Sequence, residues 1–183
     1  MGDDKETIER KVADTFFDWL KNQGGPVFVF SRRAGEAPDL VYVNGIDELQ
    51  VEVTGAYYDA DHARLLWEYE RGAENPPTGW HGVGNADKAL AEDVLTRLRD
   101  KCRKRYGGTT ILLIFIPPGL TSADDLWELV SAQTLPSVIP YVGVYVVGRF
   151  PISTRRPTSV GDYRVLPVKE YWPLPSSVYQ YSP

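Results

Sequence analysis

Residues 109–116, which read Thr-Thr-Ile-Leu-Leu-Ile-Phe-Ile, constrain the fold of this chain more than any other segment. Apolar side chains at consecutive positions of a strand point to both faces of a sheet, so both faces must be covered. Such a run is typical of a central strand in an α/β protein, and the Pro-Pro-Gly at residues 117–119 ends it. The run therefore predicts an α/β domain with a buried strand at its centre.

Three segments around this strand predict helices. Apolar residues recur at helical spacing across residues 5–20, and a Gln-Gly-Gly-Pro sequence follows them as a stop. Residues 85–106 predict a second helix, with an asparagine cap at its start and two glycines after its end. A third, shorter helix is predicted from a cap at Thr121 or Ser122 to about residue 132.

Further strands are predicted on both sides of the central one. Residues 27–30 form a short β run, and residues 39–44 and 48–54 read as two adjacent strands. Asn44-Gly45 lies between these two and predicts a tight turn, so that they pair as a hairpin. Residues 141–147 predict one more strand after the third helix.

The 183 residues predict a single domain, because no long Gly/Ser or low-complexity linker divides them. Residues 55–84 lack a clean period and predict an irregular insertion, with one or two helical turns around residues 60–70. Residues 151–183 are rich in proline and aromatic side chains, and they predict an extended tail packed over the body of the domain.

Composition excludes several classes of protein. The single cysteine, Cys102, excludes an internal disulfide framework and a zinc site with several cysteines. No stretch approaches the roughly 20 apolar residues of a membrane span, and the acidic start is unlike a signal peptide, so we expect a cytoplasmic protein without a membrane partner. The net charge of −5 argues against non-specific coating of nucleic acid, although cations clustered at residues 32–33 and 101–105 leave room for a local basic groove.

Two carboxylates of the predicted hairpin stand where folding does not need them. In the second strand, Glu52 belongs to a polar face that alternates with apolar residues. Asp39 opens the first strand and is expected to face Glu52 across the pair. Two carboxylates without a nearby histidine or thiolate form a hard oxygen site, which suits Mg²⁺ or Mn²⁺ better than zinc.

The order helix, three strands, helix, strand, with Pro38-Asp39 on the second strand and Glu52-x-Thr54 on the third, resembles the PD-(D/E)xK nuclease superfamily over residues 5–116. The resemblance implies a restriction-endonuclease-like αβββαβ core, a mixed central sheet flanked by helices, here with an extra helix and strand at the C-terminal end. It also implies that Asp39 and Glu52 bind one or two divalent metals. The superfamily's lysine, two residues after the glutamate, is replaced by Thr54, and this is a departure.

Some branches of the superfamily carry that lysine on the following helix, and Glu52-Val-Thr54 is similar to the variant seen there. Lys101 is then the lysine that the resemblance implies, with Lys104 and Lys88 as runners-up. A glutamate of the first helix often joins the metal site in this superfamily. Glu9, beside the apolar stripe, is chosen over Glu6 for this role.

The activity implied is metal-dependent hydrolysis of phosphodiester bonds in nucleic acid, with Asp39, Glu52 and Lys101 as the catalytic set. Gln50, Thr54 and Lys104 are then expected to contact the substrate, and a solvated strand residue is the alternative for Gln50. The resemblance does not distinguish DNA from RNA, and it leaves open whether a homodimer completes the cleft.

Other functions stay open at this point. The fold can persist without the chemistry, as a catalytically inactive module that binds proteins or regulates a partner. An unrelated domain that binds a small anion at the helix starting near Asn85 is a third hypothesis. His62 and His81, both in the predicted insertion, are either a second metal site or incidental loop residues, and incidental placement is the more common case.

Overall fold

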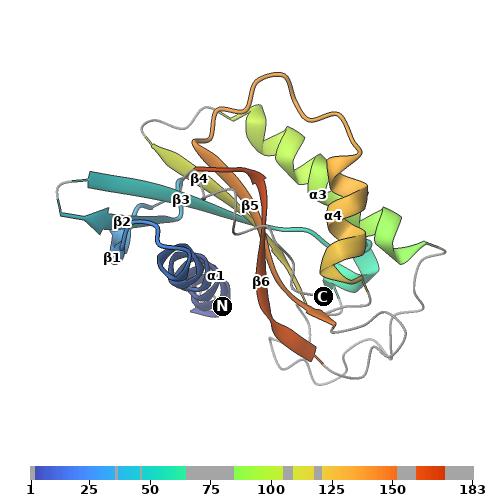
Figure 1. The fold of residues 1–183 in the computed structure, drawn as a ribbon, viewed down its shortest axis with the longest axis horizontal. Helices are drawn as coiled ribbons and strands as arrows, with labels where there is room; N and C mark the ends of the chain where they lie inside the picture. Colours follow the sequence, from blue (N-terminus) through green and yellow to red (C-terminus); the bar gives the residue numbers. More distant parts are fainter. Residues whose placement is uncertain are drawn as a thin grey trace.

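The protein is a mixed six-stranded sheet with helices on both faces, which confirms the predicted α/β class (Figure 1). The structure is a computed structural model. It describes residues 3–35, 37–45, 47–64, 85–104, 109–117, 121–151 and 160–171.

The six strands follow one another across the sheet in chain order. The first three pair antiparallel, β4 and β5 run parallel to β3, and β6 returns antiparallel to β5. The strands are β1 (Val29–Arg33), β2 (Leu40–Asn44), β3 (Asp47–Gly55), β4 (Thr110–Ile116), β5 (Gly143–Pro151) and β6 (Val160–Lys169). The apolar run identified in the sequence is therefore an interior strand, as predicted.

Three helices cover the sheet: α1 (Asp3–Asn22), α3 (Ala86–Cys102) and α4 (Ala123–Ser131). Helix α1 lies on one face, and α3 and α4 lie together on the other (Figure 1). The predicted caps are present, because Asn85 Oδ1 accepts a hydrogen bond from Lys88 N at 2.9 Å and Ser122 Oγ accepts one from Asp125 N at 3.1 Å. Within the described ranges, no helix has the length and apolar character needed to cross a membrane.

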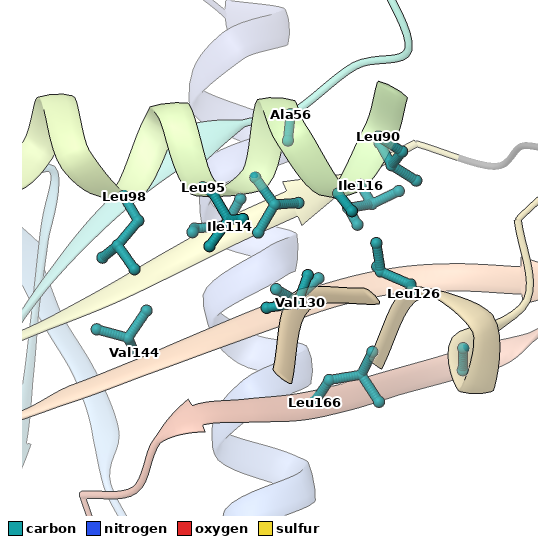
Figure 2. Close-up of a cluster of buried hydrophobic side chains, with 14 of the residues drawn as sticks. Ala56, Leu90, Leu95, Leu98, Ile114, Ile116, Leu126, Val130, Val144 and Leu166 are labelled. Atoms are coloured by element: carbon teal, nitrogen blue, oxygen red, sulfur yellow. The ribbon is translucent and has the colours of Figure 1, made fainter. Parts of the chain in front are cut away.

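Two apolar layers hold the helices against the sheet. On the α3 and α4 side, Leu112 and Ile114 of β4 are fully buried among residues of both helices and of β5. Figure 2 shows Ile114 in this layer beside Leu95 of α3. On the α1 side, Ile111 and Leu113 of the same strand pack with Phe16 and its neighbours. The alternation of β4 between these layers explains why every position of the strand is apolar.

Some predicted boundaries were wrong. The first strand was expected at residues 27–30, but it runs from Val29 to Arg33 because it follows its partner β2. The predicted extended tail contains β6, which pairs with β5. Its proline, Pro167, lies on an outer strand, where a missing N–H can face away from the partner, so proline content was a poor guide there.

Other predictions concern residues outside the described ranges. Residues 60–64 are helical, in agreement with the helical turn expected there, but most of the predicted insertion, residues 65–84, lies outside the described residues. The same holds for residues 172–183 of the predicted tail. The second helix was expected to reach residue 106, but α3 ends at Cys102 and Arg103 is its C-cap.

The β2–β3 hairpin sets up the end of the sheet at which the candidate residues meet. Gly45 has a positive φ of 61°, as its tight turn requires. The pairing of the two strands ends at Leu40 and Val51, whereas β3 continues to Gly55. The last residues of β3 therefore extend beyond β2, and the residue before β2, Asp39, lies beside them.

Candidate active site

Asp39 is a buried carboxylate fixed to the edge of β3. Its side chain is 9% exposed, and Oδ2 accepts a hydrogen bond from the backbone N–H of Val53 at 2.7 Å. Burial raises the pKa of Asp39 to about 6, because the charged form loses water. The Val53 hydrogen bond opposes this rise, and the negative charges of Glu52 and Glu9 add to it. Asp39 is thus coupled to both of the other predicted metal ligands.

Glu52 is buried too, at 4% exposure, although its alternation with apolar residues indicated a solvated face. Its register partner on β4 is Leu112, which belongs to the layer under α3 and α4. Glu52 therefore points toward α3, and Lys101 Nζ of that helix donates a hydrogen bond to Glu52 Oε1. The helix covers this side chain, which a single-strand pattern does not reveal.

Lys101 is held at this position by the end of α3. Its side chain is 17% exposed, and Leu98, one turn earlier, is fully buried. The phenol of Tyr141, a buried residue before β5, donates a hydrogen bond to the carbonyl oxygen of Lys101 at 3.1 Å. The runner-up lysines lie elsewhere: Lys104 is exposed past the end of α3, and Lys88 pairs with Glu92 at 3.7 Å on the solvent side.

Glu9 approaches from α1 and is 4% exposed, whereas the side chain of Glu6 is 52% exposed. Two cations flank the Glu9 carboxylate: Lys5 Nζ lies 3.2 Å from Oε1, and Arg33 Nη2 lies 3.0 Å from Oε2. The choice of Glu9 over Glu6 agrees with this geometry. Its role as a metal ligand stays a prediction.

A cavity of about 180 Å³ lies where these elements meet. It is lined by residues of both faces of the sheet: Lys5, Ile8, Glu9, Val53, Thr54, Gly55, Tyr57, Lys101 and Phe115. The cavity therefore wraps around the edge of β3 beyond β2. Gly55 shapes its wall, since a Cβ at that position would lie 2.5 Å from the Tyr57 hydroxyl oxygen.

The three residues predicted to contact the substrate have different surroundings in the structure. Thr54 lines the cavity. Gln50 Oε1 accepts a hydrogen bond from Thr110 Oγ1 of the neighbouring strand at 3.1 Å. Lys104 is exposed, and it is not among the described residues that line the cavity.

Lys5, Arg33 and Tyr57 belong to this region, but sequence reasoning did not assign them to it. Lys5 precedes Glu9 by one helical turn, a spacing that places both on one helix face and was available as a signal. Arg33 was noted only as part of a cationic pair. No pattern pointed to Tyr57, whose backbone N–H donates to Asp93 Oδ2 at 2.8 Å.

His62 is not among the described residues that line the cavity, and its backbone N–H donates to Asp59 Oδ1 at 2.6 Å. It is 5% exposed, its ring meets that of Tyr58 edge-on at 5.0 Å, and burial lowers its pKa. The second histidine, His81, lies outside the described residues. Throughout the described part of the chain, no group of three or more His, Cys, Asp or Glu side chains is arranged to hold a metal.

A hard cation with few protein ligands still fits the donor set of this site. Mg²⁺ keeps several waters and is often bound through one or two carboxylates plus substrate phosphates. For such a cation Asp39 and Glu52 would supply carboxylate oxygens, and Val53 would add a backbone carbonyl. Gln50 of β3 and Ala56, just after the strand, donate their N–H groups to the β4 side. Val53 donates to Asp39 on the opposite edge, so its carbonyl faces that edge too.

Comparison of the chain with protein-family models, with curated proteins and with solved structures finds no match. We therefore infer the function from the arrangement of these side chains and from the chemistry that this arrangement permits.

Proposed function

We propose that this protein is a Mg²⁺- or Mn²⁺-dependent nuclease that hydrolyses phosphodiester bonds of nucleic acid. One observation carries the proposal: a lysine from α3, Lys101, contacts the strand glutamate Glu52 beside the buried aspartate Asp39. This is the convergence that the superfamily resemblance requires when the strand lysine is missing. One hairpin supplies the two carboxylates, and a helix supplies the lysine 49 residues after Glu52.

The order of elements supports a restriction-endonuclease-like core. From α1 to β4 the chain runs helix, three antiparallel strands, helix, and a strand parallel to the third. The candidate residues stand at the end of the sheet where β3 extends beyond β2. We include this core in the proposal, with α4 and β5 as the additional C-terminal elements.

Asp39 and Glu52 would hold the cation, together with the Val53 carbonyl. A bound Mg²⁺ or Mn²⁺ supplies a polarised water and a Lewis acid for the phosphoryl oxygen. Because the pKa of Asp39 is about 6, its carboxylate is ionised at neutral pH, as a cation ligand must be.

In this proposal Lys101 contacts the phosphate at the point where negative charge develops. Its amine lies in the cavity wall, and the Glu52 contact and the anchored helix end restrict its position. A donor fixed before the reaction does not need to reorganise, which is the main source of electrostatic catalysis. Arg103 and Lys104 follow Lys101 in the chain and are exposed, and Arg103 also pairs with Asp100 at 3.2 Å.

The inactive module remains the second candidate because every carboxylate of the site already has a protein partner. Lys101 pairs with Glu52, Arg33 and Lys5 pair with Glu9, and the Val53 N–H donates to Asp39. These contacts form without a metal. Under this alternative the fold serves as a binding or regulatory surface.

Calorimetric titration with Mn²⁺, with and without an oligonucleotide, distinguishes the nuclease from the inactive module. Wild type should bind Mn²⁺, and Asp39→Ala combined with Glu52→Ala should not. Glu48→Gln is the matched control, because it removes an exposed carboxylate of the same strand. Labelled single- and double-stranded DNA and RNA would then be tested for cleavage by wild type and Lys101→Met. If wild type binds no Mn²⁺ at millimolar concentration, even with an oligonucleotide present, the nuclease proposal is wrong.

A further inference from the structure

Lys5 stands at an unfavourable place in its helix. It lies in the first turn of α1, where the helix dipole disfavours a cation. Its partner Glu9 follows it by four residues, and this order of a lysine before a glutamate is the weaker of the two possible orders. Helix formation therefore does not explain a lysine at this position.

The need to neutralise Glu9 does not explain a lysine at position 5 either. Arg33 already contacts the other carboxylate oxygen of Glu9 at 3.0 Å. The Lys5 side chain is 64% exposed, whereas that of Glu9 is 5% exposed. Lys5 thus approaches a buried carboxylate from the solvent side, and its long side chain can reach other anions at the same opening.

The surroundings of Lys5 are those of the candidate site. Lys5 lines the same cavity as Lys101, from the opposite helix. Glu9 raises the pKa of Lys5, and Asp39 and Glu52 add to the rise, so its amine lies within electrostatic range of all three carboxylates. The two lysines differ in exposure: Lys101 is 17% exposed and held on Glu52, whereas Lys5 is largely in water.

We infer that Lys5 is a substrate-binding residue that contacts a phosphate of the nucleic-acid strand entering this cavity. The inference rests on the proposed nuclease function and adds separate roles for the two lysines. Lys101 contacts the phosphate at the metal, and Lys5, on α1, binds the strand from the other side of the opening. Glu9 and Arg33 then act as positioning residues that fix the end of α1 over the edge of β3.

Charge balance agrees with this assignment. The carboxylates of Glu6, Glu9, Asp39 and Glu52 face the cations of Lys5, Arg33 and Lys101, so these seven side chains sum to a formal charge of −1. A divalent metal would make the site positive by one. A phosphodiester brings negative charge to the same place, and the exposed lysine is the cation that can turn toward it.

The test is the salt dependence of oligonucleotide binding, measured by fluorescence anisotropy with labelled single- and double-stranded DNA in the presence of Mn²⁺. Each phosphate contact contributes about 0.7 to the slope of log K against log salt for a single strand and about 0.9 for a duplex. Lys5→Met should lower the slope by that amount and weaken binding about five- to eightfold at 0.1 M salt. Lys5→Arg should restore most of the affinity.

Lys21→Met is the matched control, since Lys21 is an exposed lysine of the same helix about 24 Å away along its axis. It removes the same charge and should leave the slope unchanged. Calorimetry with Mn²⁺ alone should give equal affinity for wild type and Lys5→Met.

The outcomes are distinguishable. If Lys5→Met and Lys21→Met give the same slope of log K against log salt, while wild type binds Mn²⁺ and DNA, the assignment of Lys5 is wrong and the nuclease proposal stands. If wild type binds neither Mn²⁺ nor DNA, the nuclease proposal fails and the role of Lys5 fails with it.

Discussion

The two ends of β3 carry the same kind of ion pair in different surroundings. Near the hairpin turn, Glu48 pairs with Arg32 at 3.0 Å, and the two side chains are 41% and 55% exposed. Four residues later, Glu52 pairs with Lys101, and these side chains are 5% and 17% exposed. Both glutamates lie on the same face of the strand, so alternation alone does not distinguish them.

The difference between the pairs lies in what their formation costs. An exposed pair keeps most of its water and contributes about 0 to 1 kcal/mol. A buried pair must give up solvation on both partners, and an apolar pair of similar size is often as stable or more stable. A buried pair beside a second buried carboxylate is therefore poorly explained by stability alone, and this favours a chemical role for the Glu52 end.

The largest effect is expected from Lys101→Met. It leaves the Glu52 carboxylate buried with its main cation removed, and breaking a buried pair in this way costs about 3 to 5 kcal/mol. Arg32→Met, at the other end of β3, should cost less than about 1 kcal/mol. Urea denaturation of both variants measures the contrast.

Adding Glu52→Gln to Lys101→Met sharpens this comparison. With both charges removed, stability should return to near that of wild type. Cleavage of oligonucleotides should stay at least about a hundredfold below wild type, as for loss of one fixed donor in a transition state. Recovery of stability together with activity would show that the pair is purely structural.

The second prediction uses the pH dependence of stability. The pKa of Asp39 is raised from 3.8 to about 6, so between these values the folded state binds more protons than the unfolded state. Stability must then fall as pH rises through this window, by up to roughly 1.4 kcal/mol per pH unit. Asp39→Asn, which cannot ionise, should flatten the fall in urea titrations from pH 4 to pH 6.5. Glu48→Gln, with an exposed carboxylate, should not.

The same titration bears on the proposed function. A carboxylate binds a cation only when it is ionised, so Mn²⁺ affinity should increase as pH rises through about 6. An affinity that is flat between pH 5 and pH 7 would remove Asp39 from the set of metal ligands.

Much of the fold could be predicted from local sequence. The apolar run of β4, the caps of α3 and α4 and the glycine turn of the hairpin each have a local physical cause, and all were correctly placed. Strand β6 was missed as a strand because the proline and aromatic content of residues 151–183 was interpreted as an extended tail. Its pairing with β5 depends on a partner that lies elsewhere in the chain.

The candidate site was also predicted only in part. The contact of Lys101 with Glu52 was expected from the family resemblance and from the position of Lys101 near the buried face of its helix. The burial of Glu52 was not, because it results from α3 packing over β3. The contact of Arg33 with Glu9 depends on how α1 crosses β1, and no local pattern encodes that crossing, whereas the four-residue spacing of Lys5 and Glu9 is a local signal.

The smallest expected effect concerns salt. The Arg32–Glu48 pair is exposed, so ions screen it, and raising salt from 0.05 to 1 M should remove whatever contribution Arg32→Met measures at low salt. The Lys101–Glu52 pair is shielded by α3, and the cost of Lys101→Met should change little over the same range. Urea denaturation of wild type and both variants at the two salt concentrations gives these values. If the cost of Lys101→Met also disappears at 1 M salt, the Glu52 end of β3 is open to solvent, and the contrast between the two ends of the strand does not hold.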